Sequence, residues 1–577
     1  MRNVLKKLSP FIAPYKSKII FAVFIGVVGS CVNLFVPDAI KNISNVIQDG
    51  IKGNIDLTLV KRYGIVALIA VVVVLVCNVL SGRLMAKYGR SVGRDLRNAI
   101  NNKINHITIA KMDSLSPGEL IARSVSDVSA VESIIARVLC AIIVNLVMII
   151  GSVVMMFKMS VSLSLCVIVS VLLGSFISTV ITKKTTPIMK AQRTEMAFMN
   201  AQIDESLNGH MLIKAFNAEE DVKKAFNDNN ERIRKDSKKA QFLSSVMTPM
   251  MSLTNNISYA VVVIFGAYLS LHGNSDITIG VIIAFVMYSR MFAAPVSTLA
   301  GTIPQIMLTS VSADRIVDLL DMPENEDVGT KTVDNLKGRV VFDNVRFGYS
   351  ENKEIIHGFS ATIEPGMKVA IVGPTGAGKS TIINLLMRFY EINSGSISID
   401  GVDIKDMKRE ELHRILGMVL QETWVFTGTI TENLIYSTQG VTKEQLKQVI
   451  LDCGLQYLIS TLPDGMDTVL NGDSISAGQK QLVTIGRVML KNPDILILDE
   501  ATSSVDTRTE KLIQDAIDKL ASDKTSFVIA HRLSTIKNAD LIFFLKDGDI
   551  VECGKHEELL ERGGAYAELY NSQFSKK

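Results

Sequence analysis

The sequence predicts a multi-pass α-helical membrane domain with six transmembrane helices, followed by an α/β domain. Six uncharged apolar runs lie within the first 310 residues, whereas short β-branched strands alternate with helical stretches after residue 338. The 577 residues are too many for one ordinary domain. The chain has 21% charged residues and a positive mean hydropathy, as expected for an apolar half joined to a soluble half. Its six cysteines form no close pair, which argues against a disulfide framework or a zinc site.

Six apolar runs carry the membrane prediction. A helix that spans a bilayer needs about 20 apolar residues, and these runs reach or approach that length. The alternative is a set of buried core helices in a large soluble protein, which rarely repeats so many uncharged runs. The runs cover roughly 19–36, 64–82, 138–157, 159–182, 241–271 and 277–289, and the last continues toward 310.

The distribution of Lys and Arg predicts the orientation of these spans. Residues 1–18 carry five basic residues and no acidic one, and the segments between spans two and three and between four and five are also basic. The positive-inside rule therefore places both termini and the two long loops in the cytosol. A cleaved signal peptide over residues 1–31 is the alternative, but the apolar run continues past Cys31.

The two cytosolic loops are about 55 residues long and contain few helix breakers. We therefore expect the membrane helices to extend into the cytosol. Each loop has one interruption that can form a short transverse helix or a simple turn. These interruptions are 116–119 in the first loop and 208–220 in the second.

Residues 321–338 are polar and turn-rich, and predict a linker between a domain at 1–320 and a domain at 339–577.

The second half of the chain contains a P-loop pattern. GPTGAGKST matches G-x-x-x-x-G-K-[ST] between a strand-like and a helix-like stretch. Backbone N–H groups of such a loop surround phosphates, with a lysine on the β/γ-phosphates and a serine on Mg²⁺. The ATP-binding residues expected here are Gly373, Pro374, Thr375, Gly376, Ala377, Gly378, Lys379, Ser380 and Thr381.

The stretch ILILDE predicts a buried parallel strand that ends in two carboxylates. Parallel α/β sheets bind ligands at the carboxyl edge of their strands. Asp499 suits the magnesium shell, and Glu500 suits the group that polarises the attacking water. A helix cap is the alternative use of two adjacent acids.

The order and spacing of these motifs resemble the nucleotide-binding domain of an ABC transporter. The six-span half resembles the exporter type, in which each chain fuses one membrane domain to one ATPase domain. The resemblance covers essentially the whole chain and identifies the interrupted loops as coupling helices. It implies ATP and Mg²⁺ as cofactors, and as partners a lipid bilayer, a second half-transporter and a hydrophobic or amphipathic substrate, but no nucleic acid. It rests on Tyr349, GPTGAGKST, Gln421, ISAGQKQ, ILILDE, SSVD and His531.

The same resemblance implies roles for isolated residues. Tyr349, 24 residues before the P-loop, is expected to stack on adenine, unless it is only a core tyrosine. Gln421 is expected to contact Mg²⁺ and sense the membrane domain, with a solvent-facing glutamine as the alternative. His531 is the expected γ-phosphate contact and the second catalytic residue, although a lone histidine is often structural. Asp506 is expected to communicate between two ATP sites.

ISAGQKQ resembles the LSGGQ signature, whose amides act across a dimer on the partner's ATP. Its expected contact residues are Ser476, Ala477, Gly478 and Gln479. Ala477 stands where glycine is usual, so its Cβ can crowd the phosphate and would cost about 1 kcal/mol if the backbone needs a positive φ. An altered signature beside an intact Glu500 favours one subunit of a heterodimer over a homodimer that tolerates alanine.

The resemblance implies ATP-driven export of drugs, amphipathic compounds or lipids by alternating access, in a bacterial cell membrane with the ATPase domain in the cytosol. Peptide export is one alternative, and an ATP-gated channel or regulatory membrane protein on the same scaffold is another. The cargo is not encoded in these motifs. Arg290 interrupts span six, and either faces a polar pathway or marks the cytosolic end of that helix.

Overall fold

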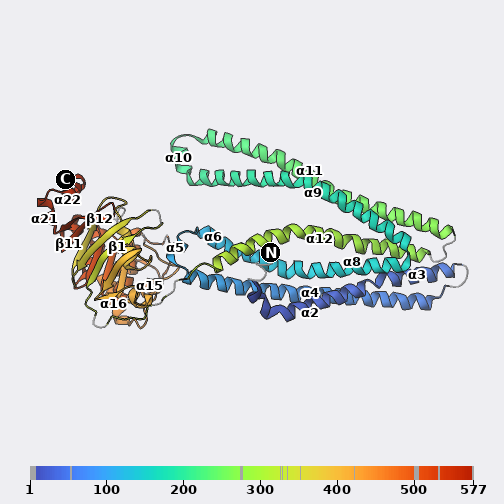
Figure 1. The fold of residues 1–577 in the computed structure, drawn as a ribbon, viewed down its shortest axis with the longest axis horizontal. Helices are drawn as coiled ribbons and strands as arrows, with labels where there is room; N and C mark the ends of the chain where they lie inside the picture. The colour runs from blue at the N-terminus through green and yellow to red at the C-terminus, as the bar shows by residue number, and fades with distance from the viewer. Residues whose placement is uncertain are drawn as a thin grey trace. The chain divides into compact units, whose positions relative to one another are not determined.

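Two compact units make up the chain in the computed structural model (Figure 1). The helical unit comprises Met1–Asn105 and Leu115–Met322, and the α/β unit comprises His106–Ser114 and Pro323–Lys577. The structure describes residues 8–51, 55–272, 277–324, 327, 329–333, 336–350, 353–421, 423–472, 474–499, 506–530 and 533–574.

Long helices build the helical unit, because an α-helix satisfies its backbone polar groups within one segment and so tolerates an apolar solvent. Helices α9 and α11 run side by side (Figure 1). The elements are η1 (Ala13–Tyr15), α2 (Lys16–Asn33), α3 (Val36–Gly50), α4 (Leu57–His106), α6 (Pro117–Ala122), η2 (Arg123–Asp127), α7 (Val128–Ser133), η3 (Ile134–Val138), α8 (Leu139–Met159), α9 (Val161–Asn208), α10 (His210–Ala215), α11 (Glu219–Leu271) and α12 (Ile279–Leu320).

The expected membrane helices are present. In the described part of the chain, 5 helical stretches are long and apolar enough to cross a bilayer, and a shorter apolar stretch, Asn256–Leu271, ends α11. Together they correspond to the six predicted spans. The five long stretches are Leu8–Gly50, Leu57–His106, Pro117–Met159, Val161–Asn208 and Ile279–Leu320.

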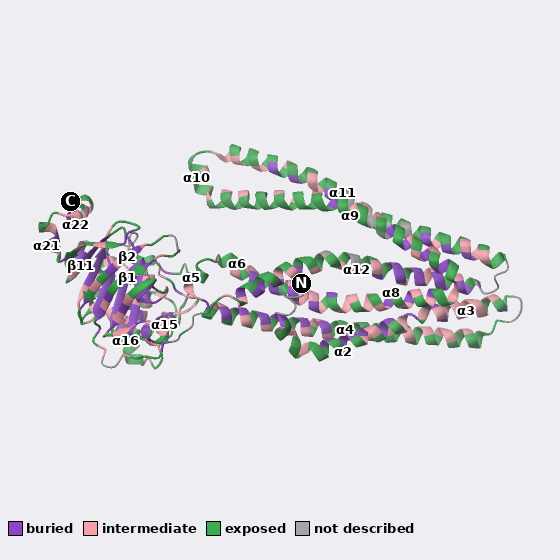
Figure 2. Cartoon of the chain, in the orientation of Figure 1, coloured by how far each residue is buried: buried purple, intermediate pink, exposed green. Residues whose placement is uncertain are grey.

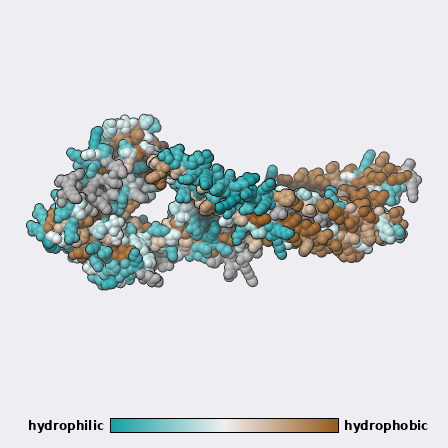
Figure 3. Space-filling view, turned by 90° about the horizontal axis from the view of Figure 1, so that it is seen from above, coloured by the Kyte–Doolittle hydropathy of each residue, from teal (hydrophilic) through white to brown (hydrophobic). Residues whose placement is uncertain are grey.

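Exposed apolar side chains cover much of the helical unit. On α4, Leu68 and Leu75 are 66% and 61% exposed. Figure 2 shows exposed residues along many of the long helices. The face drawn in Figure 3 is apolar over one stretch of the helices and hydrophilic over another. A water-soluble helix would bury such a surface, so this distribution indicates contact with lipid along the apolar stretch.

Small polar side chains join helices inside the apolar surroundings. Ser258 of α11 lies 2.7 Å from the Ser170 hydroxyl of α9 and 3.5 Å from the Ser289 hydroxyl of α12. Such hydrogen bonds hold membrane helices together where hydrophobicity alone does not distinguish protein from lipid. The neighbouring Arg290 Nε donates to the Tyr259 hydroxyl at 3.0 Å, and its guanidinium carbon lies 4.9 Å from that ring centroid. Arg290 therefore has a protein partner on α11.

The short helix predicted in each interrupted loop is present in the second loop but lies at other residues in the first. In the second loop, the short helix α10 lies within 208–220, as expected. In the first loop, residues 116–119 do not form a separate transverse helix. Ser116 is instead the N-cap of α6 and accepts a hydrogen bond from Glu119 N at 3.2 Å. The separate short helix is α5 (Ile109–Met112), which lies upstream and belongs to the α/β unit.

Two main sheets form the centre of the α/β unit. The first is antiparallel with the order β2-β1-β4-β5, and the second has six strands in the order β12-β11-β3-β10-β9-β6. The strands are β1 (Val340–Phe347), β2 (Ile356–Ile363), β3 (Lys368–Val372), β4 (Ser394–Ile399), β5 (Val402–Asp403), β6 (Leu416–Val419), β7 (Gly428–Thr429), β8 (Val469–Leu470), β9 (Ile495–Asp499), β10 (Thr525–Ile529), β11 (Leu541–Lys546) and β12 (Asp549–Gly554).

Helices surround these sheets and aromatic side chains fill the space between them. Phe342 of β1 lies 5.1 Å from Phe359 of β2 and 6.3 Å from Phe527 of β10, measured between ring centroids. These edge contacts join the two sheets in one core. The helices are α13 (Lys379–Leu386), α14 (Arg409–Ile415), α15 (Ile430–Ile435), α16 (Lys443–Asp452), α17 (Gln456–Thr461), η4 (Gly465–Asp467), α18 (Ala477–Lys491), α19 (Thr507–Ala521), α20 (Leu533–Lys537), α21 (His556–Glu561) and α22 (Ala565–Phe574).

The register of the six-stranded sheet positions its functional loops. Strand β10 lies parallel to both neighbours, with Ile529 opposite Ile371 of β3 and opposite Asp499 of β9. Strand β6 is parallel to β9, with Val419 opposite Leu498. Four carboxyl ends therefore meet at one edge of the sheet.

Arg388 provides a stability test for the α/β unit. This buried side chain donates from Nη1 to the carbonyls of Ile404 at 3.1 Å and Met407 at 3.0 Å. Arg388→Ala leaves both carbonyls without this donor and should cost about 2–4 kcal/mol, lowering the melting temperature of the purified chain by about 5 °C or more. Arg414→Ala, which removes an exposed ion pair with Glu411, is the matched control. An equal effect of the two changes would contradict the role of the buried bonds.

Candidate nucleotide site

The P-loop lies between β3 and α13 and turns at two glycines. Gly376 and Gly378 have φ values of +84° and +96°, in the left-handed region that disfavours a side chain. A Cβ on Gly378 would also lie 2.8 Å from Ile356 Cδ1. The first N–H groups of α13 have no partner within the helix, which is the usual arrangement for holding a phosphate.

Lys379 lies against the loop that it is expected to serve. Its Nζ donates to the carbonyls of Gly373 at 2.8 Å and Pro374 at 2.9 Å. Burial lowers the pKa of Lys379, and the negative charge of Asp499 opposes this shift. A polyphosphate in the loop would supply the charge that favours the ammonium form. In the rest of the expected set, Thr375, Gly376 and Ser380 are exposed, whereas Ala377, Gly378 and Thr381 are buried.

The carboxyl edge of the sheet brings distant sequence motifs together. Asp499 is the last residue of β9, next to β10 and one strand away from β3, which leads into the P-loop. Gln421 follows β6 by two residues and is exposed. Glu500 and His531, the two expected catalytic residues, lie outside the described residues. The strands that precede them, β9 and β10, end at this same edge.

Tyr349 lies close to the P-loop helix. Its hydroxyl is 3.3 Å from Thr381 Oγ1, and its ring meets the rings of Phe347 and Tyr390 at centroid distances of 5.0 Å and 4.9 Å. The ring is half-exposed. Tyr349 is therefore a tethered surface aromatic rather than the core residue of the alternative interpretation.

The signature-like stretch forms the start of α18. Ser476 Oγ accepts from Gln479 N at 3.3 Å, and Gln479 Oε1 accepts from Ser476 N at 2.9 Å. This capping box fixes the first turn of the helix, in which Gly478 is buried. Ala477 is the first helical residue and has no positive φ. The condition under which alanine would strain this backbone, a positive φ, is therefore not met, because the cap places the residue in ordinary helical geometry.

Asp506 is the N-cap of α19. Its carboxylate accepts from Arg508 N at 3.1 Å and Thr509 N at 3.0 Å. The backbone hydrogen bond from Thr509 is the main reason that the pKa of Asp506 is lowered. Asp506 thus has a local structural function in the described part of the chain, and its expected role between ATP sites stays a prediction.

Family models match both halves of the chain. The model described as "ABC transporter transmembrane region" matches residues 19–296, and the model described as "ABC transporter" matches residues 356–503. A "Fatty acid ABC transporter ATP-binding/permease protein" of Mycobacterium bovis is 40% identical over 82% of this chain and 75% of its own length. The chain belongs to the ABC transporter family.

Further relatives of this ABC transporter chain include a flippase, a multidrug resistance transporter and an exporter of known structure. An "ATP-dependent lipid A-core flippase" of Vibrio cholerae is 33% identical over 84% of each chain. A "Multidrug resistance ABC transporter ATP-binding and permease protein" of Lactococcus lactis is 32% identical over 96% of this chain and 93% of its own. A solved bacterial Atm1-family ABC exporter with ATP bound has a TM-score of 0.77 at 27% identity, covering 97% of this chain and 99% of the other. The predicted exporter-type half-transporter and its ATPase activity are confirmed at family level.

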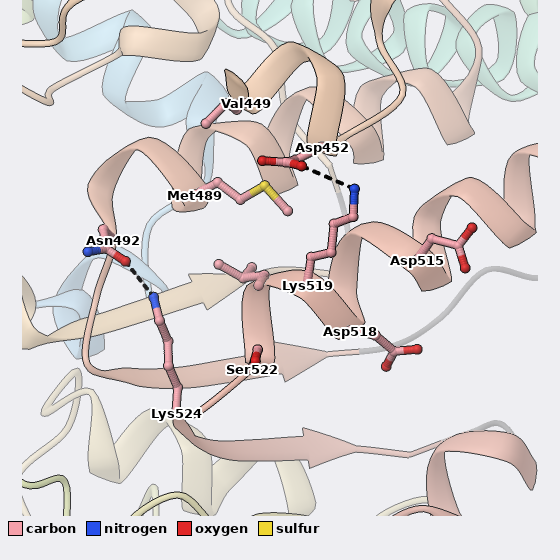
Figure 4. Close-up of a pocket in the computed structure, with 10 residues that line it drawn as sticks. Val449, Asp452, Met489, Asn492, Asp515, Asp518, Lys519, Ser522 and Lys524 are labelled. Atoms are coloured by element: carbon pink, nitrogen blue, oxygen red, sulfur yellow. Dashed lines mark hydrogen bonds and ion pairs between the residues drawn. The ribbon is translucent and has the colours of Figure 1, made fainter. Parts of the chain in front are cut away.

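A pocket of about 910 Å³ on the ABC transporter's α/β unit is not this nucleotide site (Figure 4). Lys519 Nζ lies 3.1 Å from Asp452 Oδ1, and Lys524 Nζ donates to Asn492 Oδ1 at 2.7 Å. Asn492 and Lys524 precede β9 and β10, so they lie at the amino ends of these strands, away from the P-loop edge. Asp452, Lys519 and Lys524 thus already pair with protein groups.

Sequence reasoning missed Tyr390 and the segment 106–114. The ring of Tyr390 contacts that of Tyr349, and its hydroxyl donates to Asp113 of the segment. The available signal was the aromatic pair at 389–390 directly after the P-loop helix. No motif linked this pair to a residue 277 positions earlier.

The geometry of α18 predicts the effect of restoring glycine in the signature. Ala477→Gly removes a good helix former from a residue that is already helical, so it should lower stability by up to about 1 kcal/mol. The melting temperature of the purified chain should accordingly stay the same or fall slightly. A clear rise would show that Ala477 is strained and would contradict the capping geometry.

Proposed function

We propose that this chain is one half of a dimeric ABC exporter that uses ATP to move hydrophobic or amphipathic compounds, of the lipid, fatty acid or multidrug type, by alternating access. The observation that carries the proposal is a P-loop at the carboxyl edge of a parallel sheet, in a chain that also has an exporter-type membrane unit. The cargo class is supported by the chain's similarity to a fatty acid transporter, a lipid A-core flippase and a multidrug resistance transporter. We further propose a bacterial cell membrane with both termini in the cytosol, on the basis of the Lys and Arg distribution.

The residues at this edge suit ATP and Mg²⁺. Among the described residues, no group of three or more His, Cys, Asp or Glu side chains can hold a metal by itself. Mg²⁺ in phosphate sites needs only one or two carboxylates and takes other oxygens from phosphates and water. We propose that Ser380, Gln421 and Asp499 contribute these oxygens. Bound Mg²⁺ neutralises charge on the phosphates during transfer.

The remaining site residues act on the nucleotide. We propose that Tyr349 stacks on adenine, and that Lys379 and the N–H groups of 373–381 bind the phosphates. Glu500 then polarises the attacking water, and His531 contacts the γ-phosphate. The tether from Tyr349 to Thr381 supports this arrangement, because it places the aromatic ring beside the P-loop helix.

Transport in inside-out vesicles tests the proposed function. We expect ATP to drive accumulation of a fluorescent lipid or amphipathic dye against its gradient. Glu500→Gln should bind ATP but lose nearly all hydrolysis and uptake, because the amide keeps the shape without the carboxylate. Lys379→Ala should weaken nucleotide binding, because it removes a charge from the phosphates.

Each alternative has its own outcome in these vesicles. Uptake of a labelled peptide alone would favour the peptide exporter. A flux that ATP gates but that never exceeds equilibrium would favour a channel, since a channel cannot build a gradient. Wild-type hydrolysis by Glu500→Gln would show that another group polarises the water.

We propose a heterodimer as the working assembly. This proposal rests on the Ala477 methyl group at the exposed start of α18, where a phosphate of the partner's site would approach. It does not depend on backbone strain. In a heterodimer this chain's P-loop and Glu500 form the competent site, and its signature covers a slow one. The two-fold homodimer that tolerates alanine is the competing assembly.

Co-purification tests the assembly. The tagged chain should co-purify with a second ABC half-transporter in which the strand equivalent to β9 is not followed by a catalytic glutamate. Glu500→Gln in this chain alone should then remove nearly all turnover of the pair, and Ala477→Gly should not restore hydrolysis at the other site. A stable homodimer with two equivalent hydrolysing sites would overturn the heterodimer.

A further inference from the structure

An aromatic cluster lies beside the P-loop helix. The Phe347–Tyr349, Tyr349–Tyr390 and Phe347–Tyr390 centroid distances are 5.0, 4.9 and 5.8 Å, and all three pairs meet edge-to-face. Such pairs contribute beyond the apolar area that they bury. Because Phe347 is buried in the core, it anchors one side of both tyrosines.

The backbone before Tyr390 is fixed independently. Arg388, two residues earlier, is buried with a φ of +53°, and its guanidinium donates to the carbonyls of Ile404 and Met407. This anchor sets where the Tyr390 ring can lie. This backbone anchor does not determine which group the Tyr390 hydroxyl hydrogen-bonds.

That partner is Asp113, whose carboxylate accepts from the Tyr390 hydroxyl. Asp113 lies in the segment His106–Ser114, which belongs to the α/β unit although the chain on either side of it, in α4 and α6, belongs to the helical unit. Burial and, second, Asp113 raise the pKa of Tyr390. The phenol therefore stays protonated and keeps donating throughout the physiological range.

A pocket of about 760 Å³ adjoins these groups, and its lining includes Asp113, Tyr349, Tyr390 and Arg409. Small-molecule sites typically have volumes of about 300–1,000 Å³. Tyr349 is 49% exposed. A base stacked on Tyr349 would thus lie near both Tyr390 and the segment that carries Asp113.

We propose that Tyr390 is a positioning residue that sets the Tyr349 ring for the nucleotide base and, through Asp113, couples base binding to the segment 106–114. This inference rests on the proposed function, in which Tyr349 stacks on adenine. Coupling between two sites is reciprocal. A change at Asp113 should therefore alter base binding, because Asp113 contacts Tyr390 and Tyr390 contacts Tyr349.

The test compares binding of ATP with binding of inorganic tripolyphosphate to the full chain in lipid nanodiscs. Tyr390→Phe keeps the ring and removes the hydroxyl, and Asp113→Asn weakens the acceptor. We expect each variant to bind ATP about threefold to tenfold more weakly. This range assumes that part of the free energy of a hydrogen bond to a charged group is lost from base binding. Tripolyphosphate has no base, so its binding should not change.

Two further variants complete the design. The double variant Tyr390→Phe with Asp113→Asn should bind ATP as tightly as the single variant that binds ATP less tightly. The reason is that the two changes remove the same interaction. Tyr457→Phe removes the hydroxyl of an exposed tyrosine on α17 and should leave both affinities unchanged.

Tyr349→Ala separates this inference from the proposed function. If Tyr349→Ala binds ATP like the wild type, the proposed stacking of Tyr349 on adenine is wrong. The positioning role of Tyr390 is then wrong as well. If Tyr349→Ala weakens ATP binding but Tyr390→Phe and Asp113→Asn do not, only the positioning role is overturned. Equal losses for ATP and tripolyphosphate in the Tyr390→Phe variant would indicate damage to the P-loop and would also overturn it.

Discussion

The parallel register of β3, β10, β9 and β6 is the constraint on which the ATPase half depends. These strands are spread over residues 368–529, yet their carboxyl ends meet at one sheet edge. Because side chains alternate along a strand, a slip of one residue would turn Asp499 to the opposite face of the sheet. The P-loop, the end of β9 and the loop after β6 then form one site only because the buried strands hold them in this register.

The helical unit obeys a different constraint. Its backbone groups are satisfied inside long helices, so exposed apolar side chains on α4 can face lipid at no cost in hydrogen bonds. Small polar groups such as Ser170, Ser258 and Ser289 then add hydrogen bonds to the apolar packing between the helices. This arrangement leaves little hydrophobic preference between one helix pairing and another, which would suit the alternating access that we propose.

Local hydrogen bonding explains why alanine is accommodated in the signature. The reciprocal Ser476–Gln479 cap places residue 477 inside the first helical turn, where a Cβ costs nothing. The altered residue therefore affects what approaches the helix from outside rather than the fold of the helix. Differences between the two ATP sites of a dimer would then come from chemistry at the interface, while each domain keeps the same stability.

The sequence by itself determined the features whose physics is local. The apolar runs, the glycines of the P-loop, the strand that ends in Asp499 and the polar segment near 321–338 each depend on neighbours within about 20 residues. The family resemblance then supplied roles for Tyr349 and Gln421, which no local pattern distinguishes from a core tyrosine or a surface glutamine. These predictions concern what each segment can do alone.

Only the tertiary structure decided which segments meet. It placed the separate short helix of the first loop at 109–112 rather than 116–119, because Ser116 is used to cap α6. It brought Asp113 to Tyr390, across 277 positions, and gave Ala477 an ordinary helical backbone. Such contacts arise from packing between elements, and the residues involved carry no periodic or motif signal before the chain is folded.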